Sequence, residues 1–331
     1  MVLKATRKDI YFDDSETRPA TARRLFLERK LVQALKQAYK HAPSAREIMD
    51  RAHVKPGDIR SIKHLVRLPI TRKPDLIELQ KSRPPYGGFL AIKPENVERV
   101  FIPQNSIYEP FHSARIKWFA QSLWAAGFRK GDIVVNTFSY HLSPDGVLCH
   151  EALRHCGATV VPTGDSGTEI QLQTMRDLKV NGFVGTPSCL LSLINKAEET
   201  GLNFRDDFTL ERAWFTGEIL TPPVRTTLED KYGIDTRQAY SVSETGGCIA
   251  YECPQKSGLH VMDDYVLEIV DSVTGNQLKP GETGEIVVTP IHNKAWGLIR
   301  YGTGDLSSMI TEPCACGRTS YLLTGILGKT A

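Results

Sequence analysis

The sequence has no long hydrophobic run, no marked excess of either charge and no internal repeat. No apolar stretch approaches the roughly 20 residues that a membrane-spanning helix needs, and the opening residues carry no hydrophobic region of a secretion signal. The 331 residues include 41 basic and 38 acidic ones, a net charge of +3. Because so small a net charge gives no basic excess that would attract a polyanion, we expect neither nucleic acid nor a membrane as a partner.

Cysteine is also scarce for a secreted, disulfide-stabilised protein. There are seven cysteines in 331 residues, an odd number. Small secreted domains depend on dense and evenly paired cysteines, so this usage indicates free thiols or metal ligands instead. The sequence therefore predicts a protein of the reducing cytoplasm.

The middle of the chain alternates between apolar runs and amphipathic segments. Strands are expected at 133–135, 158–161 and 182–185, and helices at 116–126, 148–155, 171–178 and 189–200. Such alternation predicts right-handed βαβ units and a parallel sheet covered by helices. Ligands bind at the carboxyl ends of the strands in such sheets, which directs attention to the loops 137–146, 162–168, 185–188 and 215–219.

The two ends of the chain differ from this pattern. At the start, apolar residues recur through 21–42, which predicts a surface helix with one buried stripe. Its expected members are Leu25, Leu27, Leu31, Leu35 and Ala38. From about 261 the pattern changes to strands and hairpin turns, which predicts a smaller antiparallel unit. The fold class is therefore α/β, with an antiparallel β subdomain.

Two glycine-rich segments enclose the most distinctive part of the sequence. One reads YSVSETGG at 240–247, and the other reads LIRYGTGD at 298–305. We predict both to be loops, each with one acid, in which a bare backbone can approach a nucleotide closely. Taken singly, Glu244 could be a solvated loop charge and Asp305 an acid in a turn.

Together, several segments resemble the adenylate-forming, or acyl-CoA synthetase, superfamily. YSVSE at 240–244 is similar to its Tyr-Gly-x-Ser/Thr-Glu motif, PGETGE at 280–285 to the hairpin that follows, and YGTGDL at 301–306 to its ribose-binding segment. Matches to the phenylacetate-CoA ligase branch stand at 68–76, 185–188, 252–260 and 313–318. The resemblance covers nearly the whole chain, in family order.

The resemblance implies a domain organisation. Residues 1–328 would form the N-terminal ATP- and acyl-binding domain, with a helical opening at 1–95, an α/β core at 96–260 and a β-rich subdomain at 261–328. Residues 329–331 would begin the hinge. The C-terminal lid domain, whose lysine bridges carboxylate and phosphate in the family, would be absent, so this chain alone would be incomplete for catalysis.

The resemblance also implies roles for single residues. Tyr240 would pack against adenine, and the loop formed by Thr216, Gly217 and Glu218 would line the base. Ser243 would hydrogen-bond the α-phosphate, Glu244 would hold Mg²⁺, and Asp305 would accept hydrogen bonds from both ribose hydroxyls. Ser243 and Glu244 are the predicted catalytic residues. An ionised carboxylate is a pure acceptor, which suits a diol or a hard cation.

A second predicted group is the acyl pocket. Phe138, Tyr140 and His141 fall where family members place residues that shape it, and Gly185, Thr186 and Pro187 could complete a slot for an aromatic ring. A core aromatic cluster is the alternative, and for Phe138 the two are equally supported. His141 stands in a polar loop and suits the core less well.

Four residues suggest a metal site. Cys253, His260, Cys314 and Cys316 would give the three thiolates and one imidazole of a closed, tetrahedral Zn²⁺ site, which would be structural. From spacing alone, zinc and free thiols remain equal alternatives. Relatives in the phenylacetate-CoA ligase branch are similar at all four positions, and the resemblance therefore favours zinc.

One segment departs from the family pattern. Family members carry a glycine-rich phosphate loop with a lysine before the helix at 116, but FIPQNSIYEP at 101–110 has neither glycine nor lysine. A loop that holds a triphosphate needs bare amides and a cation. We expect ATP binding to be weaker here, provided by other groups, or lost.

Three hypotheses follow. The first is an aryl-CoA ligase core, an AMP-forming acid–thiol ligase that uses Mg-ATP to convert a phenylacetate-type acid to an acyl-adenylate and then to a CoA thioester. The second is a non-catalytic homologue that binds an aromatic compound or a nucleotide. The third, a purely structural zinc protein, leaves Tyr240, Ser243, Glu244 and Asp305 without a role. The resemblance also suggests a homodimer.

Overall fold

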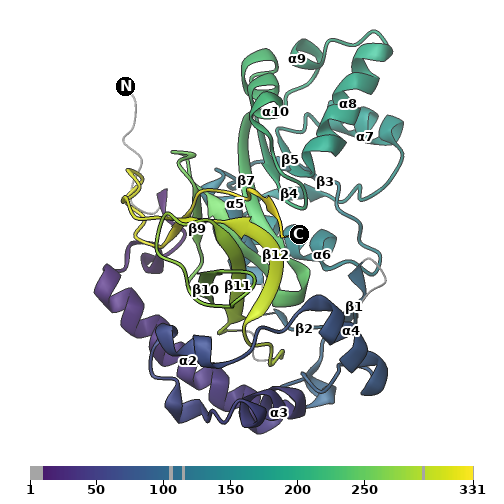
Figure 1. The fold of residues 1–331 in the computed structure, drawn as a ribbon. Helices are drawn as coiled ribbons and strands as arrows, with labels where there is room; N and C mark the ends of the chain where they lie inside the picture. The colour runs from purple at the N-terminus through teal and green to yellow at the C-terminus, as the bar shows by residue number, and fades with distance from the viewer. Residues whose placement is uncertain (1–9, 104–106, 114–115, 293–294, 331) are drawn as a thin grey trace. The chain divides into compact units, whose positions relative to one another are not determined.

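The structure is a computed structural model that describes residues 10–103, 107–113, 116–292 and 295–330 (Figure 1). The chain divides into two compact units, each built from separate stretches of sequence. Unit 1 consists of Met1–Asp13, Ile116–Ser241 and Ala250–Leu259, and unit 2 of Asp14–Arg115, Val242–Ile249 and His260–Ala331. The helical opening and the β-rich end of the chain thus share one unit, so the compact units do not follow the sequential division expected from the sequence.

Unit 1 contains the predicted parallel sheet. Its strands, in spatial order, are β4 (Thr159–Val161), β3 (Ile133–Asn136), β5 (Gly182–Gly185), β6 (Arg212–Phe215) and β7 (Asp235–Val242). Every neighbouring pair is parallel. β5 is buried along its whole length, as expected for a strand with partners on both sides and both faces covered. The parallel α/β prediction is confirmed.

Helices connect these strands. They are α5 (Ile116–Ala125), α6 (Pro144–His155), α7 (Thr168–Asp177), α8 (Pro187–Glu199), α9 (Phe204–Asp207), α10 (Pro222–Thr226) and the π-helix η7 (Thr227–Lys231). α5 ends where Gly127 adopts a φ of 95°, a left-handed conformation that glycine adopts without steric cost. The core of unit 1 packs Phe183 and Phe215 of the sheet against Leu190 and Ile194 of α8.

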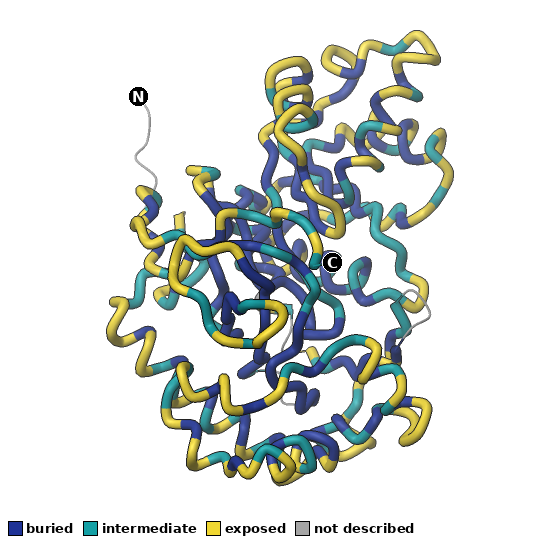
Figure 2. The backbone as a smooth tube through the Cα atoms, in the orientation of Figure 1, coloured by how far each residue is buried: buried dark blue, intermediate teal, exposed yellow. Residues whose placement is uncertain are grey.

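Unit 2 begins with a series of helices. They are η1 (Asp14–Thr17), α2 (Ala20–His41), α3 (Pro43–Arg51), η2 (Pro56–Asp58), η3 (Ile62–Arg67), α4 (Lys73–Ser82) and η4 (Pro94–Asn96). In α2 the predicted stripe is buried at Leu27, Leu31, Leu35 and Ala38, and exposed and buried positions alternate along the helix in Figure 2. Leu25 is 59% exposed, so its assignment to the stripe was wrong. It lies two positions before Leu27, which places it on another face of the helix.

The remaining strands are mostly antiparallel. They are β1 (Arg99–Phe101), β2 (Glu109–Phe111), β8 (Gly247–Glu252), β9 (Leu259–Val261), β10 (Tyr265–Val270), β11 (Gly284–Pro290), β12 (Tyr301–Ser307), β13 (Met309–Ile310), β14 (Leu322–Leu323) and β15 (Gly328–Lys329), with the 3₁₀ turn η8 (Ser243–Thr245) before β8. In unit 2, β10, β11, β12 and β15 form a four-stranded sheet in that order. Its three strand pairs are antiparallel, which confirms the predicted β subdomain.

The second glycine-rich segment is a strand and not the predicted loop. Residues 301–307 form β12, whose pairing with β11 shifts register between Glu285 and Val287. A Cβ atom on Gly302 would lie 2.7 Å from the Glu285 carboxylate, and Gly304 has a φ of 72°. Gly302 is needed because the Glu285 side chain approaches its backbone closely, and Gly304 because the strand is irregular there. Glycine inside a strand commonly marks such sites.

Within the described ranges, no helix is both long and apolar enough to cross a membrane.

Candidate active site

Four of the predicted nucleotide-binding residues lie in unit 1, at the carboxyl ends of two adjacent strands. Phe215 of β6 is paired with Gln238 of β7, so the loop that begins with Thr216 starts beside Tyr240. The Gln238 amide donates a hydrogen bond to the backbone carbonyl of Glu218 (3.3 Å). The structure thus places the predicted base-lining loop next to the predicted adenine contact.

The loop itself is shaped by a glycine and by polar contacts. Gly217 has a φ of 84°, which a larger residue rarely adopts. The Glu218 carboxylate accepts hydrogen bonds from the amide (3.2 Å) and the hydroxyl (2.7 Å) of Ser188 at the start of α8. Thr216 is 2% exposed, and its hydroxyl has no hydrogen-bond partner among the described residues. A buried hydroxyl without a partner is costly unless something pairs with it.

The predicted acyl-pocket residues come from the ends of β3 and β5, which are adjacent and parallel. A Cβ atom on Gly185 would lie only 2.1 Å from the Thr137 hydroxyl, so the two strand ends meet closely and only glycine fits. Thr186 caps α8, where its hydroxyl accepts from the Cys189 amide (3.2 Å), and Pro187 is the first residue of that helix. These two positions therefore also have a structural role.

The aromatic residues of the predicted pocket are only partly buried. Phe138 is half-buried and His141 is exposed, so neither belongs to the core of unit 1. The Tyr140 hydroxyl accepts from the Asn136 amide (2.8 Å) and lies 3.2 Å from Nδ1 of His150. Burial raises the pKa of Tyr140 to about 12. Tyr140 is therefore a neutral group at neutral pH.

Ser243 and Glu244 lie in unit 2, in the short turn η8. Ser243 is half-buried, and Glu244 is 9% exposed. Gly246, with a φ of 103°, ends the turn and donates its amide to the Ser243 carbonyl (2.9 Å). The predicted phosphate and magnesium residues are thus neighbours on one short turn.

Two residues from other elements contact Glu244. Lys73, the first residue of α4, lies 3.0 Å from Oε1 of Glu244. The Tyr301 hydroxyl of β12 hydrogen-bonds the same carboxylate, and burial, together with Glu244, raises the pKa of Tyr301 above its usual range. The turn is therefore surrounded by one ammonium and one neutral phenol.

Asp305 lies on β12, in the same unit as Glu244. It is 8% exposed, and its amide donates to the Thr303 hydroxyl (3.1 Å). Its carboxylate forms an ion pair with Lys329 of β15 (2.6 Å). The predicted ribose acceptor is thus a largely buried carboxylate with one cation beside it.

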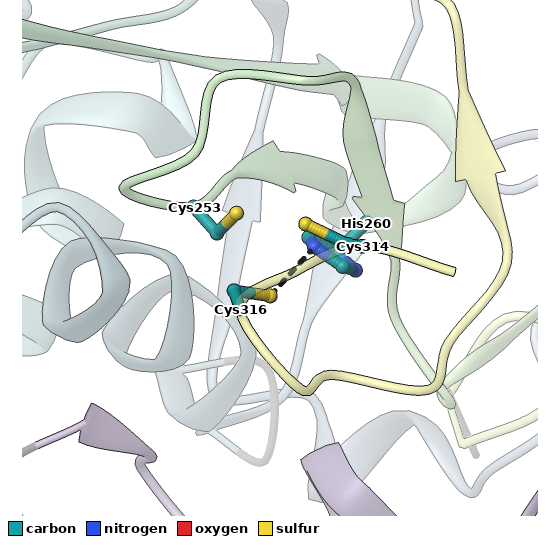
Figure 3. Close-up of side chains that lie close together, drawn as sticks. All are labelled: Cys253, His260, Cys314 and Cys316. Atoms are coloured by element: carbon teal, nitrogen blue, oxygen red, sulfur yellow. Dashed lines mark hydrogen bonds between the residues drawn. The ribbon is translucent and has the colours of Figure 1, made fainter. Parts of the chain in front are cut away.

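The four predicted metal ligands come together, as Figure 3 shows. One ligand atom from each of Cys253, His260, Cys314 and Cys316 lies within 4.8 Å of all the others. The Cys316 sulfur is 3.3 Å from Nε2 of His260, while Nδ1 of His260 lies 3.1 Å from the Ser320 hydroxyl. None of the described cysteines forms a disulfide.

This donor set fits zinc. A tetrahedral ion with Zn–S bonds of about 2.3 Å places its ligand atoms roughly 3.8 Å apart, close to the spacing of this cluster. Cys253 and His260 are fully buried, and Cys314 is 8% exposed. The contact of Ser320 with Nδ1 of His260 directs Nε2 toward the cysteines, as groups that hydrogen-bond a ligating histidine do at metal sites.

Comparison with known proteins assigns the chain to a family. Residues 111–292 match the family of AMP-binding enzymes. The chain belongs to this family. It is 32% identical to phenylacetate-coenzyme A ligase from Thermus thermophilus over 97% of this chain and 73% of that protein. It is 30% identical to phenylacetate-coenzyme A ligase from Escherichia coli over 96% of this chain and 74% of that protein. The predicted superfamily is confirmed.

Solved structures of the family have the same fold. A crystal structure of 2-hydroxyisobutyryl-CoA ligase, in an open conformation with 2-HIB-AMP and CoA, superposes with a TM-score of 0.90 at 26% identity. It covers 95% of this chain and 71% of that chain. A benzoate-CoA ligase from Burkholderia xenovorans has a TM-score of 0.52 at 15% identity, which supports the fold alone.

The segment that departs from the AMP-binding pattern forms a hairpin. β1 and β2 pair antiparallel, with Phe101 opposite Glu109. Residues 104–106 of the predicted departure lie outside the described residues. At Tyr108, the Gln80 side chain accepts from the backbone amide (2.8 Å) and donates to the carbonyl (2.9 Å). This amide is therefore already bonded, unlike the free amides of a phosphate loop.

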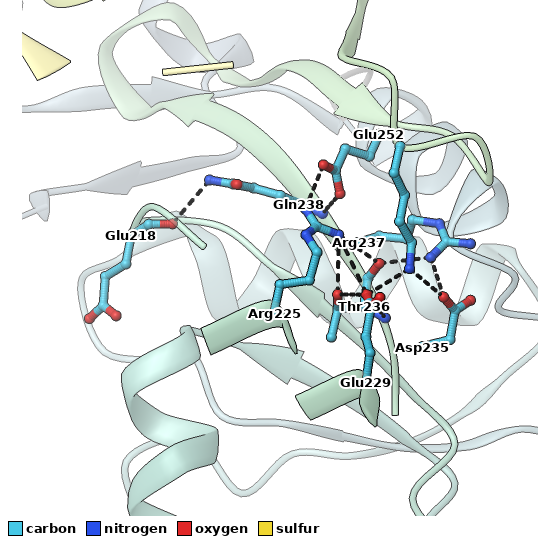
Figure 4. A network of polar contacts seen from close by, with 9 residues as sticks. Glu218, Arg225, Glu229, Asp235, Thr236, Arg237, Gln238 and Glu252 are labelled. Atoms are coloured by element: carbon cyan, nitrogen blue, oxygen red, sulfur yellow. Dashed lines mark hydrogen bonds and ion pairs between the residues drawn. The ribbon is translucent and has the colours of Figure 1, made fainter. Parts of the chain in front are cut away.

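A polar network holds the 250–259 stretch of unit 1 in place (Figure 4). Glu252, the residue before Cys253, accepts from the Arg225 guanidinium (2.6 Å) and from the backbone N–H of Gln238 (2.8 Å). Lys256 lies 2.6 Å from Glu229 on the π-helix η7 and 3.0 Å from Asp235 at the start of β7. The loop that supplies one metal ligand is thus fixed to the strand that carries Tyr240.

This network predicts an acid-sensitive unit 1. Burial would raise the pKa of Glu229 and of Asp235, but hydrogen bonds and nearby cations bring both below their ordinary values of 4.5 and 3.8. Their stabilisation is complete above about pH 5 and is lost as the pH falls through the lowered values. Urea unfolding followed by circular dichroism should therefore give a smaller free energy of unfolding at pH 4 than at pH 7.

Lys256→Met provides the matched comparison. Removing this cation lets both carboxyl pKa values rise. At pH 7 the free energy of unfolding of the variant should be lower than that of the parent by about 1 kcal/mol or less. Between pH 7 and pH 4 it should fall by less than that of the parent does. An identical pH dependence in parent and variant would refute the role of the network.

Sequence reasoning missed three of these neighbours. It gave no role to Lys73, although Lys73 stands in the 68–76 segment that resembles the ligase branch. Tyr301 was noted only as part of its motif, and Lys329 only as the start of a hinge. All three are far in sequence from the acids that they contact, and only the family motif around Lys73 offered a signal.

Proposed function

We propose that the chain is the core of an AMP-forming aryl-CoA ligase. A carboxylate oxygen of the acid attacks the α-phosphorus of ATP and releases pyrophosphate. The CoA thiol then attacks the acyl carbon and displaces AMP. The observation that carries the proposal is the cluster of Glu244, Lys73 and Tyr301 beside Ser243, in a chain of the AMP-binding family.

Unit 2 would bind the phosphates and the ribose. The Ser243 hydroxyl would donate to the α-phosphate, and Asp305 would accept from the two ribose hydroxyls. Glu244 offers the hard oxygen ligands that Mg²⁺ prefers, and the ion would neutralise phosphate charge when bound. Because Lys73 already lies at Glu244, it would supply a cation near the phosphates that the 101–110 segment does not provide.

Unit 1 would bind the adenine and the acid. Tyr240 and the 216–218 loop would hold the base, with the Thr216 hydroxyl available as a donor or acceptor. Phe138, Tyr140 and His141 would enclose the acyl group with the segment 185–187. Gly185 would keep one wall flat, since no side chain fits there. An aromatic acid of the phenylacetate type is the proposed substrate, and relatives named phenylacetate-coenzyme A ligase support it.

The Cys₃His cluster would hold a structural Zn²⁺. Four protein ligands leave no open position for a reacting molecule, so the ion would fix the loops that carry Cys253 and Cys314 and take no part in the reaction. A cytoplasmic location and assembly into a homodimer remain part of the proposal, and neither is needed for the chemistry described.

A second function has one specific observation in its favour. Gln80 holds the Tyr108 backbone where family members are expected to have a phosphate loop. If that segment no longer binds phosphate, the chain would bind an aromatic acid or a nucleotide without turnover.

Calorimetric titration with Mg-ATP, AMP, phenylacetate and a stable phenylacetyl-adenylate analogue separates the two functions. Tight binding of the analogue, with weaker binding of ATP and of the acid, is expected for the ligase core. Such an analogue makes the contacts of the nucleotide and of the acid in one molecule. Binding of phenylacetate without any nucleotide would replace the ligase proposal with the binder.

The variant Asp305→Ala tests the ribose site. We expect AMP to bind about 1–3 kcal/mol more weakly, since the ribose hydroxyls would lose a charged acceptor. The control is Glu312→Ala, at an exposed acid of the same unit that forms no hydrogen bond or ion pair with a described residue. Equal AMP affinity in parent and Asp305→Ala would remove Asp305 from the site.

A further inference from the structure

A groove in unit 2 has an unusual set of charges. It has a volume of about 590 Å³ and lies between the end of α3, the segment 66–72 and the turn 272–276. Arg51, Arg67, Arg72 and Arg300 line it, and no acidic residue does so among the described residues. The residues assigned above to the nucleotide, the acid and the metal are not among those that line this groove.

Two of the arginines are fixed from behind. Arg300 is 2% exposed, and its Nε and Nη2 each donate to Glu268 at 3.1 Å. Arg72 donates through both terminal nitrogens to Glu285, at 2.6 and 2.9 Å. The carboxylates of Glu268 and Glu285 are both buried. Arg300 also donates to the backbone carbonyls of Leu68 (2.6 Å) and Gly275 (2.9 Å), so it forms part of the groove wall. The Arg72 side chain is 38% exposed, and its guanidinium is held in place before anything binds, which lowers the entropic cost of binding.

The other two arginines have charge to offer. Arg67 is exposed and forms no hydrogen bond or ion pair with any residue that the structure describes. The Arg51 side chain is 79% exposed, and its only ion pair in the described chain is a long one of 3.7 Å with Glu47. The groove thus has two positive charges that are not neutralised, next to two that are.

These features select a class of compound. Guanidinium groups pair with phosphate through two parallel hydrogen bonds, and a cluster of them favours a molecule with several negative charges. The hydroxyl of Ser272 and the amide of Asn276 add neutral hydrogen-bonding groups. The volume of this open groove suits a small molecule, and a net charge of only +3 argues against a polynucleotide.

We propose that this arginine groove binds the phosphate groups of a small, multiply phosphorylated molecule. Two sources share this chemistry, namely inorganic polyphosphate and a nucleoside bisphosphate. The site is separate from Asp305 and Ser243. It adjoins Glu244 through the chain at two points, because the lining residues Arg72 and Arg300 are followed by Lys73 and Tyr301, which contact that acid.

Calorimetric titration of the 331-residue chain with inorganic tripolyphosphate and with adenosine 3′,5′-bisphosphate tests the site. We expect saturable binding of at least one, weakened about tenfold in Arg67→Ala, which corresponds to ~1.4 kcal/mol. Arg67 is exposed, so this change should leave the fold intact, and an unchanged melting temperature would confirm it. The matched control is Arg176→Ala, at an exposed arginine of α7 in unit 1, with unchanged affinity expected.

The double variant Arg51→Ala/Arg67→Ala should bind more weakly still. Asp305→Ala separates this proposal from the nucleotide site, since it should leave tripolyphosphate binding unchanged even if AMP binding is lost. Binding of only one of the two probes would support the groove and identify the source. No saturable binding to the parent, full affinity in Arg67→Ala, or an equal loss in Arg176→Ala would overturn the proposal.

Discussion

Replacing Cys314 with serine is expected to abolish binding of the zinc ion proposed for the Cys₃His cluster and to lower the melting temperature by roughly 10 °C. Structural zinc sites contribute binding free energies on the order of 10 kcal/mol to folding, and a serine hydroxyl is a poor ligand in place of a thiolate. The Cys₃His cluster connects the 250–260 segment to the 314–316 loop. Losing it should loosen both segments.

The measurement is zinc content by plasma mass spectrometry, together with thermal unfolding. The matched control is Cys189→Ser, at a half-buried cysteine outside the cluster, which should keep one zinc ion per chain. A metal chelator should lower the melting temperature of the parent and of the control, and leave that of Cys314→Ser unchanged. Equal zinc content in Cys314→Ser and parent would show that this thiolate is not a ligand.

The second large effect is expected from Glu268→Gln. This substitution leaves the Arg300 guanidinium buried without its counter-charge, since Glu268 and Arg300 have side-chain exposures of only 1% and 2%. Breaking such a pair from one side costs about 3–5 kcal/mol, much more than the pair itself contributes. Urea unfolding followed by circular dichroism should show a large fall in the unfolding midpoint.

Glu78→Gln is the control for this result. Glu78 pairs with Lys81 at 2.7 Å, but the two side chains are 72% and 67% exposed. An exposed pair of this kind contributes at most about 0.5 kcal/mol, so the control should unfold like the parent. Equal effects of the two substitutions would contradict the assignment of Glu268 and Arg300 as a buried structural pair.

The sequence predicted the parallel sheet because its signal is local. Short apolar runs around Val134 and Phe183, separated by amphipathic segments, specify strands and helices without reference to distant residues. The error at Leu25 arose within one helix, where one apolar residue pointed away from the stripe. The glycines at 302 and 304 suggested a loop. The close approach of Glu285 to Gly302 could not be predicted, because it depends on the pairing of β11 with β12.

The candidate site was predictable in its members but not in its contacts. Motif resemblance selected Glu244 and Asp305, and the metal cluster was selected partly by its cysteines. Lys73 could not be assigned to Glu244, since the contact depends on how α4 and η8 pack within unit 2. The division of the chain into two interleaved units was likewise not predicted, because hydrophobic patterns identify elements and not their long-range partners.

The ion pair between Asp305 and Lys329 makes the proposed binding of a ribose an exchange and not a simple addition. The ammonium of Lys329 contacts Oδ1 of Asp305, so a ribose hydroxyl that binds this oxygen would compete with it. The Lys329 side chain is 74% exposed, so water can solvate it after displacement at little cost. The backbone pairing of β12 with β15 does not involve that side chain, and the sheet can stay intact while its lysine swings into solvent. Added salt weakens nucleotide binding by screening its charged contacts. It also screens the Asp305–Lys329 ion pair but not the neutral hydroxyls, so part of that weakening would be offset.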